Sequence, residues 1–276
     1  MSRLRADKWA LFFMASSPAI FQAAITGQNG FLTGALMIAA GAFPDRRPII
    51  AGVAAGLLTV KPQLGLLIPI AFVAAGCWRA FFAAAATAII LAFASSLAFG
   101  TESWIGFYEG ATAHGARMAA AGFPFNKLVT PFGFVTMLGA PAALAGAVQA
   151  AAALLLAAFV FIVWRRVKAA DIRYAALAAA AVLATPYAFY YELTVMAPAI
   201  MLIAKRGAET GWLKYEKIML IAVWILPLMM PGPDVAPNLS NCAAGALLAF
   251  AMVARRALPE AGIRFASAKR PATAGL

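Results

Sequence analysis

Polar side chains gather at a few breaks between the apolar runs of this 276-residue chain. Gln28 and Asn29 lie between two glycines, and Lys61 and Gln63 flank a proline. Amide groups bind hydroxyls, an ammonium group binds an anion, and glycines let a ligand approach the backbone closely. These residue types indicate a polar site at one end of a hydrophobic hairpin, whose other end is the charged turn Asp45-Arg46-Arg47-Pro48.

Lys61 is the sharpest of these signals because apolar residues surround it on both sides. A lysine deep in a bilayer costs about 2.5–3.5 kcal/mol, and less near the interface. One interpretation is that its long side chain reaches the lipid headgroups. The other is that Pro62 breaks the helix there, because open backbone groups at membrane depth are tolerated where protein lines a cavity.

A second set of polar residues follows another predicted helix break, at Thr185-Pro186. Tyr187, Tyr191 and Glu192 lie just beyond it, and Lys127 occurs in an earlier polar segment. Ordinary structural roles are open for each: an aromatic belt with a solvated carboxylate, a loop lysine, and an outer turn at Gln28-Asn29. The functional interpretation places all of them around one site.

Composition decides the class of protein. Hydrophobic residues make up 64% of the chain and charged residues 12%, against about 45–50% and 25% in soluble domains. A polytopic all-α membrane bundle follows, and the net charge of +12 fits cytoplasmic loops beside membrane lipids. No aromatic-interleaved basic patch suggests nucleic acid. One histidine and two distant cysteines give no metal-ligand spacing, and we expect no cofactor.

Apolar runs separated by basic turns predict about ten spans. When the spans are oriented by the cytoplasmic bias of Lys and Arg, every basic turn falls on the cytoplasmic side. The polar clusters then share the outer face. The predicted spans are residues 9–25, 31–43, 48–60, 64–76, 80–99, 141–164, 174–185, 193–204, 218–230 and 239–254. Residues 128–139, and a segment carrying Trp104 and Tyr108, suit helices at the interface. We expect a membrane domain over 1–256 and a disordered cytoplasmic tail over 257–276.

Several of these motifs resemble glycosyltransferase family 87, formerly domain of unknown function 2029. The closest matches are Gly27-Gln28-Asn29-Gly30-Phe31-Leu32-Thr33 and Lys61-Pro62-Gln63-Leu64-Gly65-Leu66-Leu67. The Asp45 turn, Trp78-Arg79-Ala80-Phe81 and Ala184-Thr185-Pro186-Tyr187 follow in the same order. The similarity runs from about Ser17 to about Arg256.

The resemblance implies a GT-C-like membrane fold in the bacterial cytoplasmic (inner) membrane. It implies inverting transfer of a hexose, typically mannose, from a polyprenyl-phosphate donor to an extracytoplasmic lipid or glycan acceptor. The resemblance implies a longer N-terminal part, with an outer loop that carries an aspartate proposed as the catalytic base, and we expect this chain to begin after that region. Asp7 lies in the basic start and is no substitute. Around the position of Glu192 many members carry two acidic residues or paired histidines, whereas in Tyr190-Tyr191-Glu192 only Glu192 is acidic.

Within that reaction, Lys61 is the candidate cation for the leaving phosphate and Glu192 the candidate base, with Lys127 as a second cation. Gln28, Asn29 and Gln63 would orient sugar hydroxyls, and no metal is required. Two other functions stay open. A transporter or lipid flippase would place polar residues along a path across the bilayer, and a truncated or inactive member would bind the lipid-linked sugar without transferring it.

Overall fold

The computed structural model describes residues 16–119, 123–226 and 241–263, and all of its regular elements are helices. Its one β-type contact among these residues is an isolated antiparallel bridge between Leu128 and Phe189. The elements are α2 (Pro18–Ile25), α3 (Gly30–Ala42), α4 (Pro48–Leu57), η1 (Leu58–Val60), α5 (Pro62–Gly65), α6 (Ile68–Ala75), α7 (Trp78–Phe99), α8 (Glu102–Ala119), η2 (Phe125–Lys127), α9 (Pro131–Met137), α10 (Ala142–Arg166), α11 (Ala170–Ala184), η3 (Tyr190–Val195), α12 (Ala197–Thr210), α13 (Glu216–Ile225) and α14 (Asn241–Glu260).

Prolines and glycines divide the apolar runs into short helices. Pro48 and Pro62 occupy the first turns of α4 and α5, where the missing N–H of proline is harmless. Gly76 ends α6 in the left-handed conformation, with φ of 70°. The predicted break at Pro62 is confirmed, but a further interruption at Leu66 and Leu67 separates α5 from α6.

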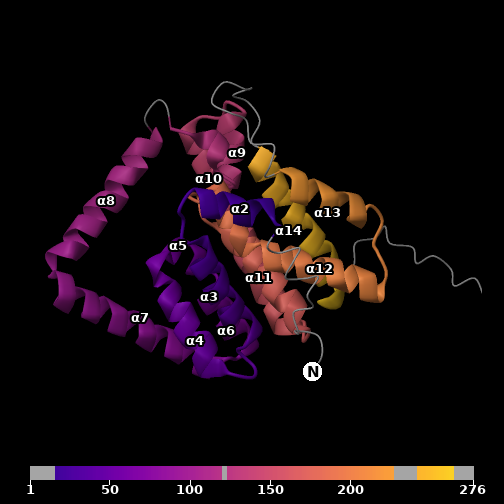
Figure 1. Cartoon of the computed structure of the whole chain (residues 1–276), viewed down its shortest axis with the longest axis horizontal. Helices are drawn as coiled ribbons and strands as arrows, with labels where there is room; N and C mark the ends of the chain where they lie inside the picture. The colour runs from indigo at the N-terminus through magenta and orange to yellow at the C-terminus, as the bar shows by residue number, and fades with distance from the viewer. Residues whose placement is uncertain (1–15, 120–122, 227–240, 264–276) are drawn as a thin grey trace, which may run out of the picture.

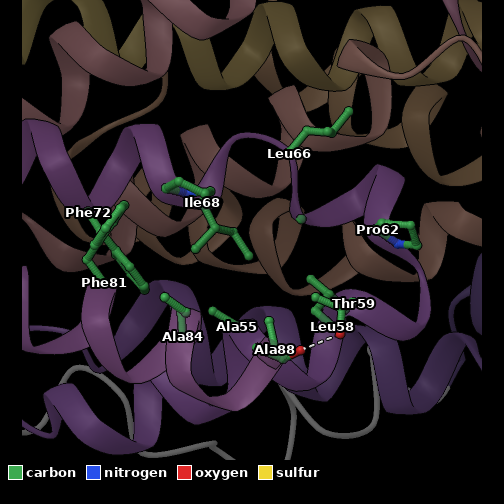
Figure 2. Close-up of a pocket in the computed structure, with 14 residues that line it drawn as sticks. Ala55, Leu58, Thr59, Pro62, Leu66, Ile68, Phe72, Phe81, Ala84 and Ala88 are labelled. Atoms are coloured by element: carbon green, nitrogen blue, oxygen red, sulfur yellow. Dashed lines mark hydrogen bonds between the residues drawn. The ribbon is translucent and has the colours of Figure 1, made fainter. Parts of the chain in front are cut away.

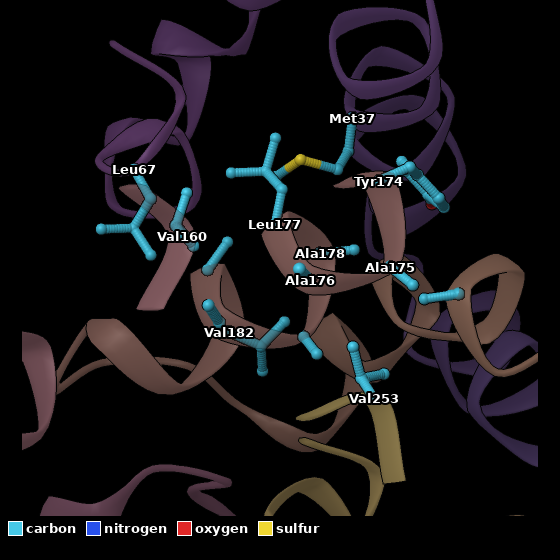
Figure 3. Packing of buried hydrophobic residues seen from close by; sticks show 14 of the residues in the cluster. Met37, Leu67, Val160, Tyr174, Ala175, Ala176, Leu177, Ala178, Val182 and Val253 are labelled. Carbon is cyan, nitrogen blue, oxygen red and sulfur yellow. The ribbon is translucent and has the colours of Figure 1, made fainter. Parts of the chain in front are cut away.

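Helix α11 forms the centre of the bundle. All of its residues from Ile172 to Ala184 are buried, and it packs against α3, α10, α12 and α14 (Figures 1 and 3). Its many alanines let these neighbours approach closely, while Tyr174, Leu177 and Val182 fill the larger gaps between them. This helix joins the two ends of the molecule, because Arg173 lies in its first turn and the Thr185-Pro186 break follows its last.

Helices α7 and α8 project from this body as an arm (Figure 1). The base of the arm is a close contact between α4 and α7, made possible by two glycines. A Cβ atom at Gly52 would lie 2.4 Å from the Ala80 carbonyl oxygen, and one at Gly56 would lie 2.4 Å from Thr87 Cβ. Small residues spaced four apart allow this kind of approach between membrane helices.

Two helices are long and apolar enough to cross a membrane: α7, with 22 residues, and α10, with 25. Only 6% and 28% of their most apolar windows are buried, so neither is the covered core helix of a soluble fold. Three shorter apolar segments accompany them: 30–42, 48–60 and 62–75. The all-α prediction is therefore confirmed, whereas the figure of about ten spans stays a prediction.

Other predicted segments have changed limits. The segment with Trp104 and Tyr108 is one regular helix, α8, and its side chains from Glu102 to Ala113 are all exposed. Helix α14 continues past Arg256 to Glu260, and Ala257 is fully buried. The start of the first predicted span, the end of the ninth, the start of the tenth and residues 264–276 of the tail lie outside the described residues.

Candidate functional site

Lys61 and Glu192 form an ion pair between two segments far apart in the chain. The Lys61 ammonium donates to Glu192 Oε1 over 2.7 Å, and 131 residues separate the two positions. Their side chains are 14% and 4% exposed. The same ammonium lies 5.4 Å from the centre of the Tyr191 ring, within range of a cation–π contact. Three of the predicted site residues therefore meet here.

Local backbone structure aims Lys61 out of the helical run. The 3-10 turn η1 tightens the end of α4, and Lys61 leaves helical geometry with φ of −134° and ψ of 73°. Its backbone N–H still donates to the Leu58 carbonyl over 2.9 Å. Pro62 then starts α5, because its fixed φ suits a first helical position. Lys61 therefore lies at a corner between two short helices.

The Thr185-Pro186 break places Glu192. Thr185 Oγ1 accepts from the Tyr187 N–H over 3.1 Å, and the Pro186 carbonyl accepts from Thr130 Oγ1 over 3.3 Å. The Val129 N–H donates to the Ala188 carbonyl over 2.9 Å, next to the Leu128–Phe189 bridge. These contacts fix the turn before η3, so Glu192 points into the protein.

One oxygen of Glu192 remains available for chemistry. Oε1 accepts from Lys61, whereas Oε2 is buried and has no hydrogen-bond partner among the described residues. Burial raises the pKa of this carboxyl above its ordinary value, and the hydrogen bond and charge of Lys61 oppose that rise. A carboxylate with one hydrogen-bonded oxygen and one oxygen without a partner suits a general base. Because Oε2 is enclosed, a hydroxyl reaches it only after neighbouring side chains move.

Aromatic rings cover the pair on one side. The Phe189 and Tyr191 rings are stacked, with centres 5.5 Å apart and an angle of 17° between their planes. Tyr187 meets Phe189 edge-on at 5.1 Å, and Phe123 lies 6.3 Å from Phe189. Burial is the main cause that raises the pKa of Tyr191, to about 12, so its hydroxyl stays protonated as a hydrogen-bond donor at neutral pH. The predicted aromatic residues thus form a wall with polar edges.

The amide residues lie on the segments around this pair. Gln28 and Asn29 precede α3, whose first residue, Gly30, is close to Thr194: a Cβ atom there would lie 3.2 Å from Thr194 Oγ1. Gln63 is half-buried on α5, two residues after Lys61. Gln28 is also half-buried and Asn29 is exposed. Their segments adjoin those of the pair, because α3 packs against η3 and α5 follows Lys61, and their amides remain candidates for binding hydroxyls.

Lys127 is placed differently from Lys61. It ends η2, just before the Leu128–Phe189 bridge, and its side chain is exposed. The bridge brings its backbone to the aromatic wall, but its exposed ammonium group is not in the ion pair that holds Glu192. It is therefore the weaker of the two candidate cations.

Two buried polar residues that position the site were not predicted. Thr194 Oγ1 donates to the Ala19 carbonyl at 3.2 Å and lies 2.7 Å from the Tyr191 carbonyl, so it ties η3 to α2. Gln149 accepts from the Phe132 N–H and donates to the Leu183 carbonyl, each at 3.0 Å. Gln149 is the one polar residue between Ala142 and Trp164. Its position as a single polar residue in a long apolar run was the signal that could have identified Gln149.

An apolar groove of about 340 Å³ (Figure 2) is lined by residues on both sides of Lys61 in the sequence. Thr59 and Pro62, which flank the lysine, line one end, and Phe72 and Phe81 line the other. The groove lies between α4, α5, α6 and α7, so the arm helix supplies one wall. Among the described residues, no group of three His, Cys, Asp or Glu side chains is arranged to hold a metal ion.

Comparison with known sequences identifies the family. The sequence model of glycosyltransferase family 87 matches residues 2–186. This range starts before the expected limit of about Ser17 and ends well before the expected limit of about Arg256. It ends six residues before Glu192, so it includes Lys61 but not the carboxylate. No curated protein and no solved structure matches the chain. The match covers well over half of the 276 residues, and the chain belongs to glycosyltransferase family 87, a membrane-associated family.

Proposed function

We propose that the chain transfers a hexose, with mannose as the first candidate, from a polyprenyl-phosphate donor to a lipid or glycan acceptor. The buried Lys61–Glu192 pair is the observation that carries this proposal, because its Oε2 atom has no hydrogen-bond partner among the described residues. Family membership supports glycosyl transfer as the reaction. The adjoining apolar groove supports a donor with a hydrocarbon tail.

In the proposed reaction an acceptor hydroxyl attacks C1 of the donor sugar. The new C1–O bond forms as the bond from C1 to the phosphate oxygen breaks, and the configuration at C1 inverts. The hydroxyl proton passes to Glu192, and the electron pair leaves with the prenyl phosphate. Lys61 offsets the negative charge that grows on the phosphate, which is worth most in a site that excludes water.

The resting pair suggests how the donor prepares the base. A donor phosphate competes with Glu192 for the Lys61 ammonium, so donor binding would free Oε1 and leave both carboxylate oxygens able to accept a proton. Movement of this ion pair would also open the enclosed carboxylate to the acceptor. Tyr187, Tyr191 and the amides of Gln28, Asn29 and Gln63 would then hold the sugar hydroxyls.

The charge distribution supports an extracytoplasmic site in the bacterial inner membrane. The basic residues Arg165, Arg166 and Lys168 lie where α10 ends and α11 begins, at the opposite end of α11 from Thr185 and the site. Basic residues favour the cytoplasmic side. A transporter is less well supported, because the polar site residues lie at one end of α11 and its residues from Ala175 to Ala184 are apolar and buried.

Transfer assays on membranes that contain the full chain test the role of Lys61. With radiolabelled polyprenyl-phosphate mannose, Lys61→Ala should lower turnover about 10²–10³-fold, the usual cost of one donor to a developing anion. Lys214→Ala is the matched control, since it removes an exposed lysine between α12 and α13, outside the segments that carry the site residues. Wild-type turnover by Lys61→Ala would remove this mechanism.

A further inference from the structure

A second pocket, of about 240 Å³, lies at the opposite end of α11 from the Lys61–Glu192 pair. It lies where α10 ends, α11 begins and the turn after α3 meets the end of α6. Its polar lining residues are Asp45, Arg165, Lys168 and Arg173, with Trp164 beside them. A water molecule occupies roughly 30 Å³ in the liquid, so this volume could hold several water molecules. It therefore has room for a phosphate group.

The charge of this pocket is positive. Three cationic side chains and one carboxylate line it. The carboxylate of Asp45 is already engaged, because its Oδ2 accepts from Arg173 Nη1 over 2.8 Å and its Oδ1 lies 3.7 Å from the Cys77 thiol. Arg165 and Lys168 are exposed. They are therefore free to turn toward a ligand, and their two charges are not offset within the pocket.

Arg173 is a buried, oriented part of the same pocket. It is 5% exposed, and its guanidinium lies 4.6 Å from the Trp164 ring centre. The Trp164 indole N–H donates to the Arg173 carbonyl over 2.9 Å, which holds the two residues together. Its Nε atom is buried with no hydrogen-bond partner among the described residues. A buried N–H without an acceptor has lost its hydrogen bonds to water without replacement, and an anionic oxygen would supply the missing acceptor.

We propose that this pocket binds a phosphate group, either on the headgroup of an anionic phospholipid or as free phosphate. Arg173 is the fixed donor, and Arg165 and Lys168 close over the ligand from the rim. Charge-assisted hydrogen bonds from arginine and lysine are the usual contacts of such groups in proteins. The site is separate from the one proposed for sugar transfer, and its occupant takes no part in the reaction.

Binding to the full chain in detergent tests this site with two probes. Native mass spectrometry measures retention of phosphatidylglycerol against phosphatidylcholine, and equilibrium dialysis measures binding of radiolabelled inorganic phosphate. Arg165→Gln/Lys168→Gln should weaken the binding of the preferred probe about tenfold or more, since it removes two charged donors. Preference for phosphatidylglycerol identifies a headgroup site, and phosphate binding without that preference identifies a free-phosphate site; both support the proposal.

Arg47→Gln/Arg79→Gln is the matched control. It removes the same charge from two exposed residues of neighbouring turns that do not line the pocket. The control should change binding less than about threefold, because screening in salt weakens the effect of exposed charges outside the site. Equal losses in both double variants would mean diffuse attraction to a basic surface and would overturn the proposal. So would the absence of phosphate binding together with equal retention of the two lipids.

Discussion

The two ends of the bundle use ion pairs in different ways. At one end a single lysine meets a glutamate whose side chain is 4% exposed and has an oxygen without a partner among the described residues. At the other end Arg206 bonds to both Asp171 and Glu260, and each of these carboxylates is more exposed than Glu192. The second arrangement uses arginine's several donors to hold helices together. The first leaves hydrogen-bonding capacity unused, which is typical of a site that acts on a ligand.

Breaking the two kinds of pair should have unequal effects on stability. Lys61→Met leaves Glu192 buried without its partner, and removing one partner of a buried pair costs about 3–5 kcal/mol. Lys61→Met/Glu192→Gln removes the orphaned charge as well, so it should unfold at a higher temperature than Lys61→Met. Thermal unfolding in detergent at neutral pH measures both variants. A double variant less stable than Lys61→Met would contradict the account of a buried, mutually dependent pair.

The pH dependence of transfer sharpens the same comparison. The deprotonated form of Glu192 is the base, so the rate should fall as pH decreases through its pKa, about tenfold for each unit below it. Burial raises that pKa above the ordinary value of 4.5, and the fall should therefore begin at a higher pH than for an exposed carboxyl. Glu192→Gln should abolish this limb of the profile. A limb that persists in Glu192→Gln would assign the titration to another group.

At the other end, Arg206→Gln should have the smallest effect. Its partners Asp171 and Glu260 are 24% and 33% exposed, and pairs of this kind contribute about 1 kcal/mol or less. The loss should shrink in high salt, because salt screens exposed charges. Thermal unfolding at low and high ionic strength measures this. Destabilisation as large as that of Lys61→Met would remove the distinction between the two ends.

Several local features of the fold follow from the sequence alone, although the interruption at Leu66 and Leu67 was not predicted. Proline at Pro48 and Pro62 and the left-handed Gly76 fix where helices begin and end, and those signals are local. Lys61 was recognised as a costly cation in an apolar run, and Glu192 as a candidate carboxylate beyond the Thr185-Pro186 break. Their direct contact across 131 residues depends on the packing of α2, α3 and η3, which no local pattern encodes.

Other features of the site depend on partners that a sequence does not reveal. Gln149 and Thr194 act through backbone carbonyls of distant helices, so their residue type alone does not predict their role. The number of spans is also difficult to predict, because several apolar runs are shorter than the roughly 20 residues of a lone spanning helix. Prolines at Pro62 and Pro69 then divide one such run into α5 and α6.

The most direct test of the central claim is the rate of sugar transfer by Glu192→Gln beside Glu216→Gln. Both substitutions neutralise a buried carboxylate that is paired with a cation, Lys61 in one case and Arg256 in the other. Glu192→Gln should lower turnover per folded molecule about 10²–10⁴-fold, the usual contribution of a general base. Glu216→Gln should reduce stability and leave that turnover near wild type. Equal turnover in the two variants would contradict a catalytic Glu192.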